Sequence, residues 1–408
     1  MNVKRVYLHF GISKTGSTSI QKTLFTNYKT LEKYGYRYLY EWKENHRTAF
    51  TQFFKTKSTK NIISKQIRNK YEMALLKKLT NAINTTNCET LILSGDYWLD
   101  YFLDSTVENL KNFILKHFES RGIETKIFIF IRNPLTWMIS HLQQRITTGI
   151  YRRNSDLVEI RINNFSGIIN LKKHFNDSLI LKKFEDGITD EYGLVGYFLK
   201  SIEFPKEHLP EINMVKANES RSLEVMEFIN YIEDREPVYR YNKYRIVNIN
   251  REYFGQDLTP IIGIKGLKFD LHYRDKLALW DRLKGTILQL QKGAGIDYSD
   301  FTPSPPGENY TVYSEDTIHG FIDAFPELSP VLQKLFLSFF EKKYSETLNP
   351  KYKKLYFKGS IPRDTYNSLG PFTWFIWYIG KYVHKTKYVI KTIRKHILGR
   401  SNGEEKHA

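Results

Sequence analysis

The sequence predicts an α/β fold in which a parallel β-sheet is flanked by helices and followed by a mainly helical C-terminal region. The main observation is that short apolar, β-branched runs alternate with segments of helical spacing along the first half of the chain. A second is that each predicted strand ends in a polar cluster. A third is that the 408 residues are 41% hydrophobic and 15% aromatic, which is enough to build a large core.

The first predicted unit is a strand, a glycine loop and a helix. Residues 3–10 read VKRVYLHF and stop at Gly11, as a buried strand does before a turn. A helix is predicted from Ser17 to a stop at Gly35. Further strands are predicted at residues 90–93, 126–131 and 178–182. Further helices are predicted at residues 65–83, 107–119 and 330–344.

Polar clusters follow these strands. In parallel sheets, ligands bind beyond the carboxyl ends of the strands, so the clusters are expected to share one site. The clusters are residues 11–18, 94–96, 132–140 and 185–186.

Charge and cysteine content narrow the class of protein. Lys and Arg number 62 against 44 Asp and Glu, a formal charge of +18 that attracts nucleotides, polyanionic glycans, nucleic acid or an acidic membrane face. Charge alone selects none of these partners, because lysine-rich composition can be general to an organism. The single cysteine, Cys88, excludes an internal disulfide and a cysteine metal cluster.

No apolar run reaches the ~18 residues that a membrane span needs. The apolar stretch at the N-terminus is also too short for a signal peptide. A cytoplasmic protein is therefore expected. The basic, aromatic tail at residues 361–408 predicts either a peripheral contact with the inner face of the membrane or a solvated helix packed on the domain.

The loop after the first strand has the composition of a phosphate site. Its glycines let successive backbone N–H groups converge on an anion, and the following helix directs its positive end to the same place. Because Lys14 precedes Gly16 by two residues, the loop is not a Walker A motif. The candidate phosphate-binding residues are Gly11, Lys14, Thr15, Gly16, Ser17 and Thr18.

The stretch LHFGISKTGSTSIQ resembles the loop of the bacterial carbohydrate-type sulfotransferases, which reads close to LHIGxxKTGTTSIQ. The resemblance implies a P-loop-like sulfotransferase fold and the donor 3′-phosphoadenosine 5′-phosphosulfate (PAPS), with PAP as product. In that family the loop grips the 5′-phosphosulfate. A strand-end Arg and a Ser eight residues later bind the 3′-phosphate, and IFIFIRNPLTWMIS supplies Arg132 and Ser140 at that spacing. A guanidinium can also bind phosphate in a bidentate way.

Two further patches are similar to the family, at residues 181–202 and 218–222. The similarity covers residues 3–225, and a weaker similarity covers residues 330–352. It implies a sulfotransferase domain over residues 1–360, with residues 235–310 as a family-specific insertion. The chain departs from the family at Lys182 and Lys183, where relatives often have Arg-Pro, which leaves the role of that patch open.

Sulfuryl transfer is an in-line displacement that depends on positioning and charge stabilisation. Lys14 is expected to neutralise the leaving phosphate, and no metal is expected. Relatives place the general base either after the first helix, where this chain has Glu41, Glu44 and His46, or at the end of the second strand, where it has Asp96. His46 and Asp96 are the preferred candidates and the sequence does not separate them.

A carbohydrate or glycan precursor is the expected acceptor, and nucleic acid is not an expected partner. Two other functions remain open from the sequence. A small-molecule kinase would share a phosphate loop and would use Asp96 to hold a metal. A non-catalytic polyanion- or glycan-binding protein would exploit the net charge and basic-aromatic stretches such as residues 239–246.

Overall fold

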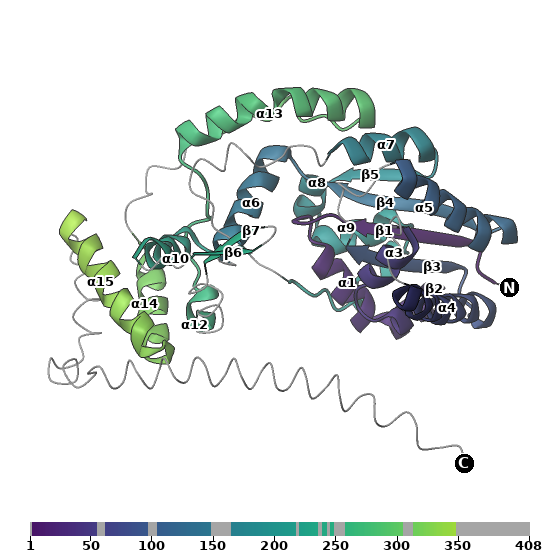
Figure 1. Cartoon of the computed structure of the whole chain (residues 1–408), viewed down its shortest axis with the longest axis horizontal. Helices are drawn as coiled ribbons and strands as arrows, with labels where there is room; N and C mark the ends of the chain where they lie inside the picture. Colours follow the sequence, from purple (N-terminus) through teal and green to yellow (C-terminus); the bar gives the residue numbers. More distant parts are fainter. Residues whose placement is uncertain are drawn as a thin grey trace, which may run out of the picture. The chain divides into compact units, whose positions relative to one another are not determined.

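Five parallel strands form the sheet at the centre of the computed structural model (Figure 1), in the order β2-β3-β1-β4-β5. The strand at the middle is β1, with β3 on one side and β4 on the other. The chain therefore passes from β3 across β1 to reach β4, which makes the carboxyl end of β1 a topological switch point. The strands are β1 (Arg5–Gly11), β2 (Tyr36–Tyr38), β3 (Thr90–Asp96), β4 (Glu124–Ile131) and β5 (Leu179–Lys183).

The structure describes residues 2–54, 62–96, 104–147, 165–217, 220–235, 239–242, 245–248, 258–304 and 313–347. The chain divides into two compact units, Met1–Tyr313 and Ser314–Ala408. No helix within the described ranges is long and apolar enough to cross a membrane. The tail at residues 361–408, its expected membrane contact and the predicted boundary near residue 360 lie outside the described residues.

Helices cover both faces of the sheet because alternate strand residues point to opposite faces. Along β1, Leu8 and Phe10 are buried in one cluster and Tyr7 in the other. The first cluster is covered by α3 (Arg47–Phe54), α4 (Ile62–Thr85), α5 (Asp104–His117), α7 (Ser166–Phe175) and α13 (Tyr273–Ala294). The second is covered by α1 (Ser17–Thr26), α2 (Tyr28–Lys33) and α9 (Gly193–Ser201).

Shorter elements complete the first unit. Among its described residues, the further helices are α6 (Pro134–Thr147), α8 (Phe184–Thr189), α10 (Leu223–Arg235) and α12 (Thr259–Ile262). Its 3₁₀ turns are η1 (Tyr40–Trp42), η3 (Glu119–Arg121) and η6 (Lys206–Glu211). A separate antiparallel pair joins β6 (Tyr239–Asn242) to β7 (Arg245–Asn248).

The second unit contains α14 (Glu315–Ala324), η7 (Phe325–Glu327) and α15 (Pro330–Thr347). The ring of Phe321 lies 5.9 Å from that of Phe336 and 5.3 Å from that of Phe340, so aromatic contacts join α14 to α15. The helix predicted at residues 330–344 is confirmed as α15.

The α/β class and the parallel sheet are confirmed, with two corrections. The edge strand β2 was not predicted, because three residues are too few to show a period. The single helix predicted from Ser17 to Gly35 is wrong: α1 ends at Thr26, Asn27 lies between the two helices, and α2 begins at Tyr28. The Asn27 side chain donates to the carbonyl of Asn213 (3.0 Å) and accepts from its N–H (3.0 Å), which ties the break to a distant segment.

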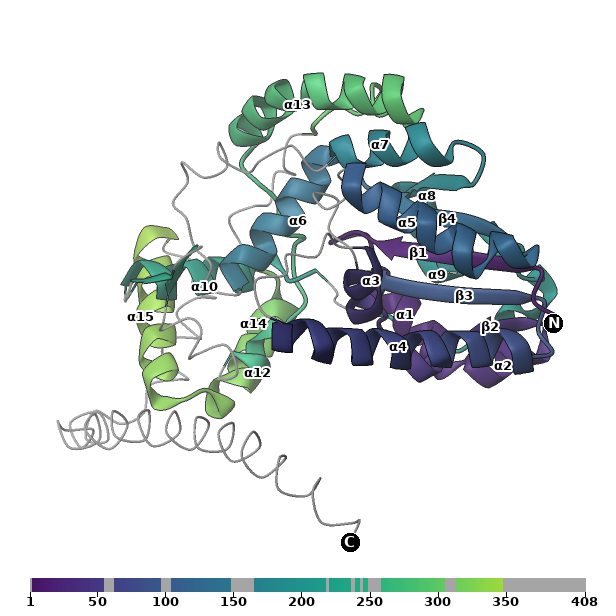
Figure 2. The same cartoon turned by 45° about the vertical axis from the view of Figure 1, so that its right-hand side comes forward.

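Residues between Leu271 and Tyr298 contribute to the core of the first unit. Helix α13 packs on α6 and α7 (Figure 2), and its apolar residues join the cluster that covers the sheet. Beyond it, the hydroxyl of Tyr298 lies 2.8 Å from the carbonyl oxygen of Ile131 and 2.9 Å from Oε2 of Glu185. This segment therefore contacts the chain where β4 and β5 end.

Replacing Tyr298 by Phe is expected to lower the free energy of unfolding by about 1 to 2 kcal/mol, because the buried Ile131 carbonyl and the partly buried Glu185 carboxylate lose their shared donor. Denaturant unfolding followed by circular dichroism measures the change. Tyr71→Phe, at a tyrosine that is 46% exposed, is the matched control. Equal effects of the two substitutions would contradict a structural role for the Tyr298 hydroxyl.

Candidate functional site

A pocket of about 660 Å³ lies at the carboxyl ends of β1, β3 and β4. A ligand site is expected at this position, because the pocket lies at the topological switch point of the sheet. Most of the residues singled out from the sequence line it: Gly11, Lys14, Gly16, Ser17, Thr18, Asp96, Arg132 and Ser140. Thr15, Glu44 and His46 do not belong to its lining.

The loop between β1 and α1 is held in an uncommon backbone conformation. Lys14 has a φ of 68°, in the left-handed region that non-glycine residues rarely adopt, and Gly16 has a φ of 71°. Thr15 closes the turn, since its hydroxyl and its N–H donate to the carbonyl of Ile12 at 2.8 and 3.3 Å. Such strain persists only where surrounding contacts fix it, and it is common at functional sites.

Those contacts come from the β4–α6 corner. Arg132 donates through Nη1 to the carbonyl of Lys14 at 2.9 Å, and the Trp137 indole donates to the carbonyl of Ser13 at 2.8 Å. With these carbonyls held, the N–H groups of Gly16 and Ser17 donate to no acceptor in the described part of the chain. They lie at the N-terminus of α1, a position that favours a bound anion.

Both glycines of the loop are required by close contacts. A Cβ at Gly11 would lie 2.5 Å from Cβ of Ser17, and one at Gly16 would lie 2.1 Å from Cδ2 of Leu194. The loop thus packs between the first helix and the α8–α9 region without room for a larger residue.

Lys14 is a partly buried cation without a carboxylate partner among the described residues. Burial, together with the charges of Arg221 and Arg132, lowers its pKa to about 8. Holding like charges together in a desolvated pocket is unfavourable, and a bound anion would relieve the cost. The electrostatics of the loop therefore favour a negatively charged ligand.

Arg132 connects the loop to the second predicted phosphate element. Its guanidinium lies over the ring of Phe184, 4.9 Å from the centroid, and its Nε donates to the hydroxyl of Thr136 at 3.2 Å. Burial lowers its pKa, and Glu185 opposes that shift. Glu185 also accepts from the N–H of Asn133 at 3.0 Å, so the start of α6 is fixed. Ser140, on the same helix, lines the pocket with Arg132.

Arg221 lines the same pocket and was not singled out from the sequence. Its Nε is buried and has no hydrogen-bond partner in the described part of the chain, and burial lowers its pKa. Gln143 fixes its backbone by donating to the Arg221 carbonyl at 2.8 Å. The sequence held only a weak signal: Arg221 lies within the patch at residues 218–222, and only tertiary packing brings it to the pocket.

Asp96 is the only carboxylate in the described lining of this pocket. Gln21 donates to its Oδ1 at 3.1 Å and Asn45 to its Oδ2 at 2.8 Å. The Asn45 side chain also accepts from the Asp96 N–H at 3.2 Å, so both the carboxylate and the strand end are fixed. Asp96 pairs with Gly11 across the sheet, which brings a proton acceptor beside the phosphate loop.

His46 is placed differently from the other candidate base. It is 1% exposed, stacks on Tyr38 at 4.8 Å and accepts through Nδ1 from the N–H of Ser94 at 3.0 Å. Burial lowers its pKa to about 3, so the ring is neutral at neutral pH. These contacts support the end of β3, two residues before Asp96. Glu44 contributes its carbonyl, which accepts from the Tyr38 hydroxyl at 2.6 Å.

Within the described ranges, no three His, Cys, Asp or Glu side chains are grouped closely enough to hold a metal ion. The arrangement is that of an anion site with one adjacent carboxylate. Comparisons of the chain with family models, with curated proteins and with solved structures find no match.

Proposed function

We propose that the protein is a sulfotransferase that uses PAPS as its donor. The observation that carries the proposal is the convergence of the Lys14 loop with Arg132 and Ser140 on one pocket. Two separate anion sites in one pocket suit a nucleotide with phosphate groups on both the 3′ and 5′ oxygens. The charge agrees, because the described lining has five cations and one carboxylate: Lys14, Arg47, Arg132, Arg221 and Lys268, against Asp96.

Each element has a role in this proposal. The N–H groups of Gly16 and Ser17 and the ammonium of Lys14 hold the 5′-phosphosulfate, and Arg221 adds a second charge there. Arg132 and Ser140 hold the 3′-phosphate. The likeness of these two segments to the bacterial carbohydrate-type sulfotransferases supports the same assignment.

The reaction that fits is attack of an acceptor hydroxyl oxygen on sulfur. The new oxygen–sulfur bond forms as the bond between sulfur and the phosphate oxygen breaks, and Lys14 stabilises the charge on the departing phosphate. Asp96 accepts the hydroxyl proton, because it lines the pocket whereas His46 lies outside the lining. A carbohydrate hydroxyl, on a glycan or its precursor, is the acceptor class that we propose.

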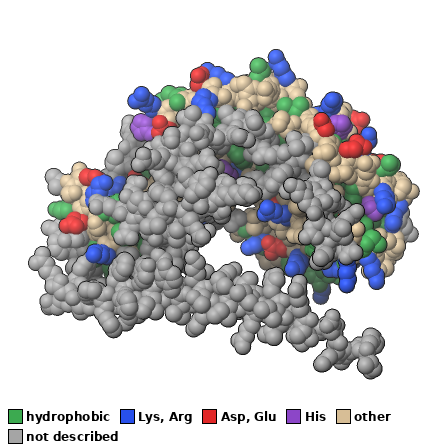
Figure 3. Space-filling view, in the orientation of Figure 1, with side chains coloured by type: hydrophobic (Ala, Val, Ile, Leu, Met, Phe, Trp, Pro, Cys, Tyr) green, Lys and Arg blue, Asp and Glu red, His purple; other side chains and the backbone are tan. Residues whose placement is uncertain are grey.

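A polyanion-binding surface is the less favoured function. Figure 3 shows Lys and Arg side chains scattered over the described part of the face in view, with Asp and Glu between them. The cations of the pocket, in contrast, lie together around the loop. A surface of mixed charge binds a long polyanion less strongly than a continuous basic stripe does.

We expect PAP to bind more tightly than ADP, and Ser140→Ala to lower the PAP affinity about tenfold through loss of one hydrogen bond to a charged group. Ser140 is a cleaner test than Arg132, which also supports the loop. Calorimetry measures both affinities, with the exposed Ser120 replaced by Ala as control. Equal PAP and ADP affinities would refute the donor assignment. Tighter binding of ATP with Mg²⁺ would point to a phosphotransferase.

The affinity for PAP is expected to fall as the pH rises above 8. The pKa of Lys14 is about 8 in the free protein, and a bound anion raises it, so binding above that pH takes up a proton. We expect roughly a tenfold loss between pH 7 and pH 9.5. In Lys14→Arg the guanidinium stays protonated, so the pH profile should be flat over this range. Parallel profiles for the two proteins would exclude Lys14 from the site.

Asp96→Asn is expected to keep the affinity for PAP within about twofold of the wild-type value. The same substitution should slow the transfer of label from ³⁵S-PAPS to a panel of carbohydrate acceptors by roughly a hundredfold or more. The amide keeps the shape of the carboxylate but cannot accept the proton. Asp281→Asn, at a carboxylate that is 74% exposed, is the control. Unchanged transfer by Asp96→Asn would remove Asp96 from the role of base.

A further inference from the structure

The phosphate pocket has two flanks that follow from the order of the strands. The loop after β1 lies in the middle, the end of β3 with α3 lies on one side, and the β4–α6 corner lies on the other. The donor contacts proposed above come from the middle and from the β4 flank, at Lys14, Arg132 and Ser140. The β3 flank contributes Arg47 and Asp96, and that assignment places no part of the donor there.

Arg47 is positioned by the same side chain that positions Asp96. Oδ1 of Asn45 accepts from the N–H of Arg47 at 2.9 Å and from the N–H of Asp96 at 3.2 Å. Nδ2 of Asn45 donates to Oδ2 of Asp96 at 2.8 Å. The start of α3 also packs closely on the strand, because a Cβ at Gly95 would lie 2.9 Å from the Arg47 nitrogen. The backbone of Arg47 is therefore fixed beside the end of β3.

The Arg47 guanidinium has no polar partner among the described residues. The residue is exposed, and no described side chain or carbonyl forms an ion pair or a hydrogen bond with its guanidinium. Arg47 is also the first residue of α3, where the helix dipole disfavours a cation. A cation in this position does not stabilise its own helix, yet it lines the pocket and is free to contact a ligand. A guanidinium binds a carboxylate or a phosphate through two parallel hydrogen bonds.

The β4 flank is bordered by a second cavity, of about 350 Å³. Arg132, Ser140 and Lys268 line both cavities, so they lie between them. The buried cation of the second cavity is already paired, because Lys276 donates through Nζ to Oδ2 of Asp270 at 2.6 Å. Lys268 is the other exposed cation in the described lining of the phosphate pocket, and it belongs to this flank.

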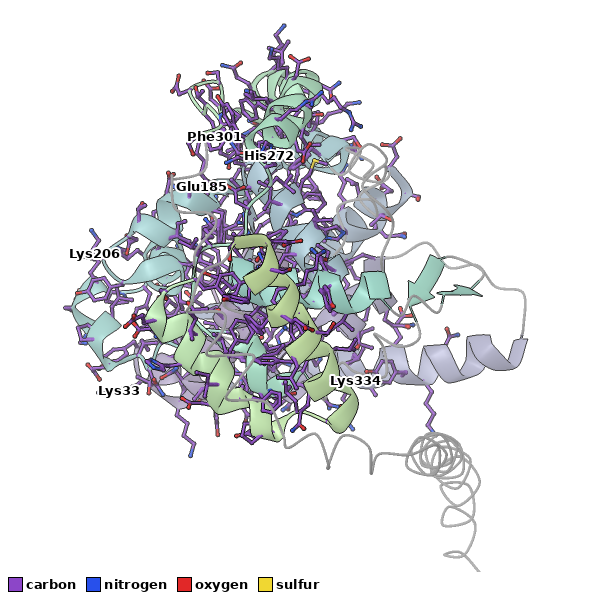
Figure 4. The ribbon with its side chains drawn as sticks, turned by 90° about the vertical axis from the view of Figure 1, so that its left-hand side faces the viewer. Lys33, Glu185, Lys206, His272, Phe301 and Lys334 are labelled. Carbon is purple, nitrogen blue, oxygen red and sulfur yellow. The ribbon has the colours of Figure 1, made fainter. Side chains whose placement is uncertain are left out.

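Apolar groups also lie on the β4 side. Phe301 lies close to His272, the N-cap residue of α13 (Figure 4), and its ring is 5.1 Å from that of Trp280. In the phosphate pocket itself, the exposed apolar residue of the described lining is Ile188, which is 54% exposed and belongs to α8, directly after β5. The described part of the β3 flank, in contrast, presents a cation and a carboxylate. A polar acceptor therefore fits beside β3 better than an apolar one does.

An acidic acceptor would need a cation on this flank. The proposed donor brings several negative charges into the pocket, and these repel a second anion at short range. Lys14, Arg132 and Arg221 are partly buried and are assigned to the donor. Within the described lining, Arg47 is the cation on the β3 flank that can offset the repulsion.

We propose that Arg47 selects acceptors that carry an anionic group, a carboxylate or a phosphate, close to the reacting hydroxyl. This inference rests on the proposed function, because it takes Asp96 to be the base and the donor to occupy the middle and the β4 flank. The acceptor hydroxyl lies at Asp96, and the anionic group forms two charge-assisted hydrogen bonds with the Arg47 guanidinium. The acceptor class is therefore an acidic sugar rather than a neutral one.

The test compares acceptors that differ only in charge, on protein saturated with PAP. One pair is a glucuronate-containing oligosaccharide and its carboxyl-reduced form. The other pair is N-acetylglucosamine 1-phosphate and the methyl glycoside of N-acetylglucosamine. Titration followed by NMR measures the affinities. Wild-type protein should bind the acidic member of at least one pair about fivefold more tightly than the neutral member, and the pair that responds identifies the anion.

Substitutions then assign the preference to one residue. Arg47→Gln should reduce it to within about twofold and change the affinity for PAP by less than about twofold. Arg47→Lys should retain part of the preference, because the charge remains while the two parallel hydrogen bonds are lost. Lys268→Gln is the matched control, since it removes the other exposed cation of the described lining. Equal losses in Arg47→Gln and Lys268→Gln would contradict a specific contact with Arg47.

The salt dependence of the preference gives a readout that needs no variant. Because Arg47 is exposed, the preference should fall by about twofold or more between roughly 50 and 500 mM NaCl. Equal binding of acidic and neutral members in both pairs, or no binding of either acidic compound, would overturn the inference. If PAP still bound in a Ser140-dependent way, the proposed function would stand. Failure of PAP to bind the wild-type protein would overturn both.

Discussion

The hydrogen bond from Arg132 to the Lys14 carbonyl is the contact on which the pocket depends. It joins the end of β4 to the loop after β1 at the carbonyl of Lys14, a residue with a left-handed backbone. The parallel sheet makes the contact possible, because β1 and β4 are neighbours and end at the same edge. Without it, the loop would keep its glycines but lose the support that holds the strained backbone.

The sequence predicted the parts of the site that are local. The loop at residues 11–18 and the segment from Arg132 to Ser140 each lie within one strand-to-helix turn. Composition was enough to single out the loop, and the family resemblance pointed to Arg132 and Ser140. The strands β1, β3, β4 and β5 were predicted because each contains a short apolar run, which is largely buried in β1, β3 and β4 and buried at Leu179 in β5. Composition does not show how a helix breaks, however, and the turn at Asn27 depends on a partner far along the chain.

The parts that were missed or left open depend on tertiary contacts. Arg221 and the Asp270–Lys276 pair have no distinctive spacing, and only folding brings them to the cavities. The choice between His46 and Asp96 was left open, because burial cannot be read from residue type. In the structure, His46 is 1% exposed although it comes from a lysine-rich segment, whereas the carboxylate of Asp96 lines the pocket.

Arg132 both lines the pocket and supports the Lys14 loop, so the free energies of ligand contacts at the two places depend on each other. A phosphate that fixes this guanidinium also fixes the Lys14 carbonyl, and so orders the neighbouring loop. In the proposed function, the two anion subsites are therefore thermodynamically coupled, and occupancy of one lowers the cost of ordering the other. The binding free energy of a molecule that carries both anionic groups is therefore more favourable than the sum of the binding free energies of two separate ions. Free energies from substitutions in the two subsites are correspondingly non-additive.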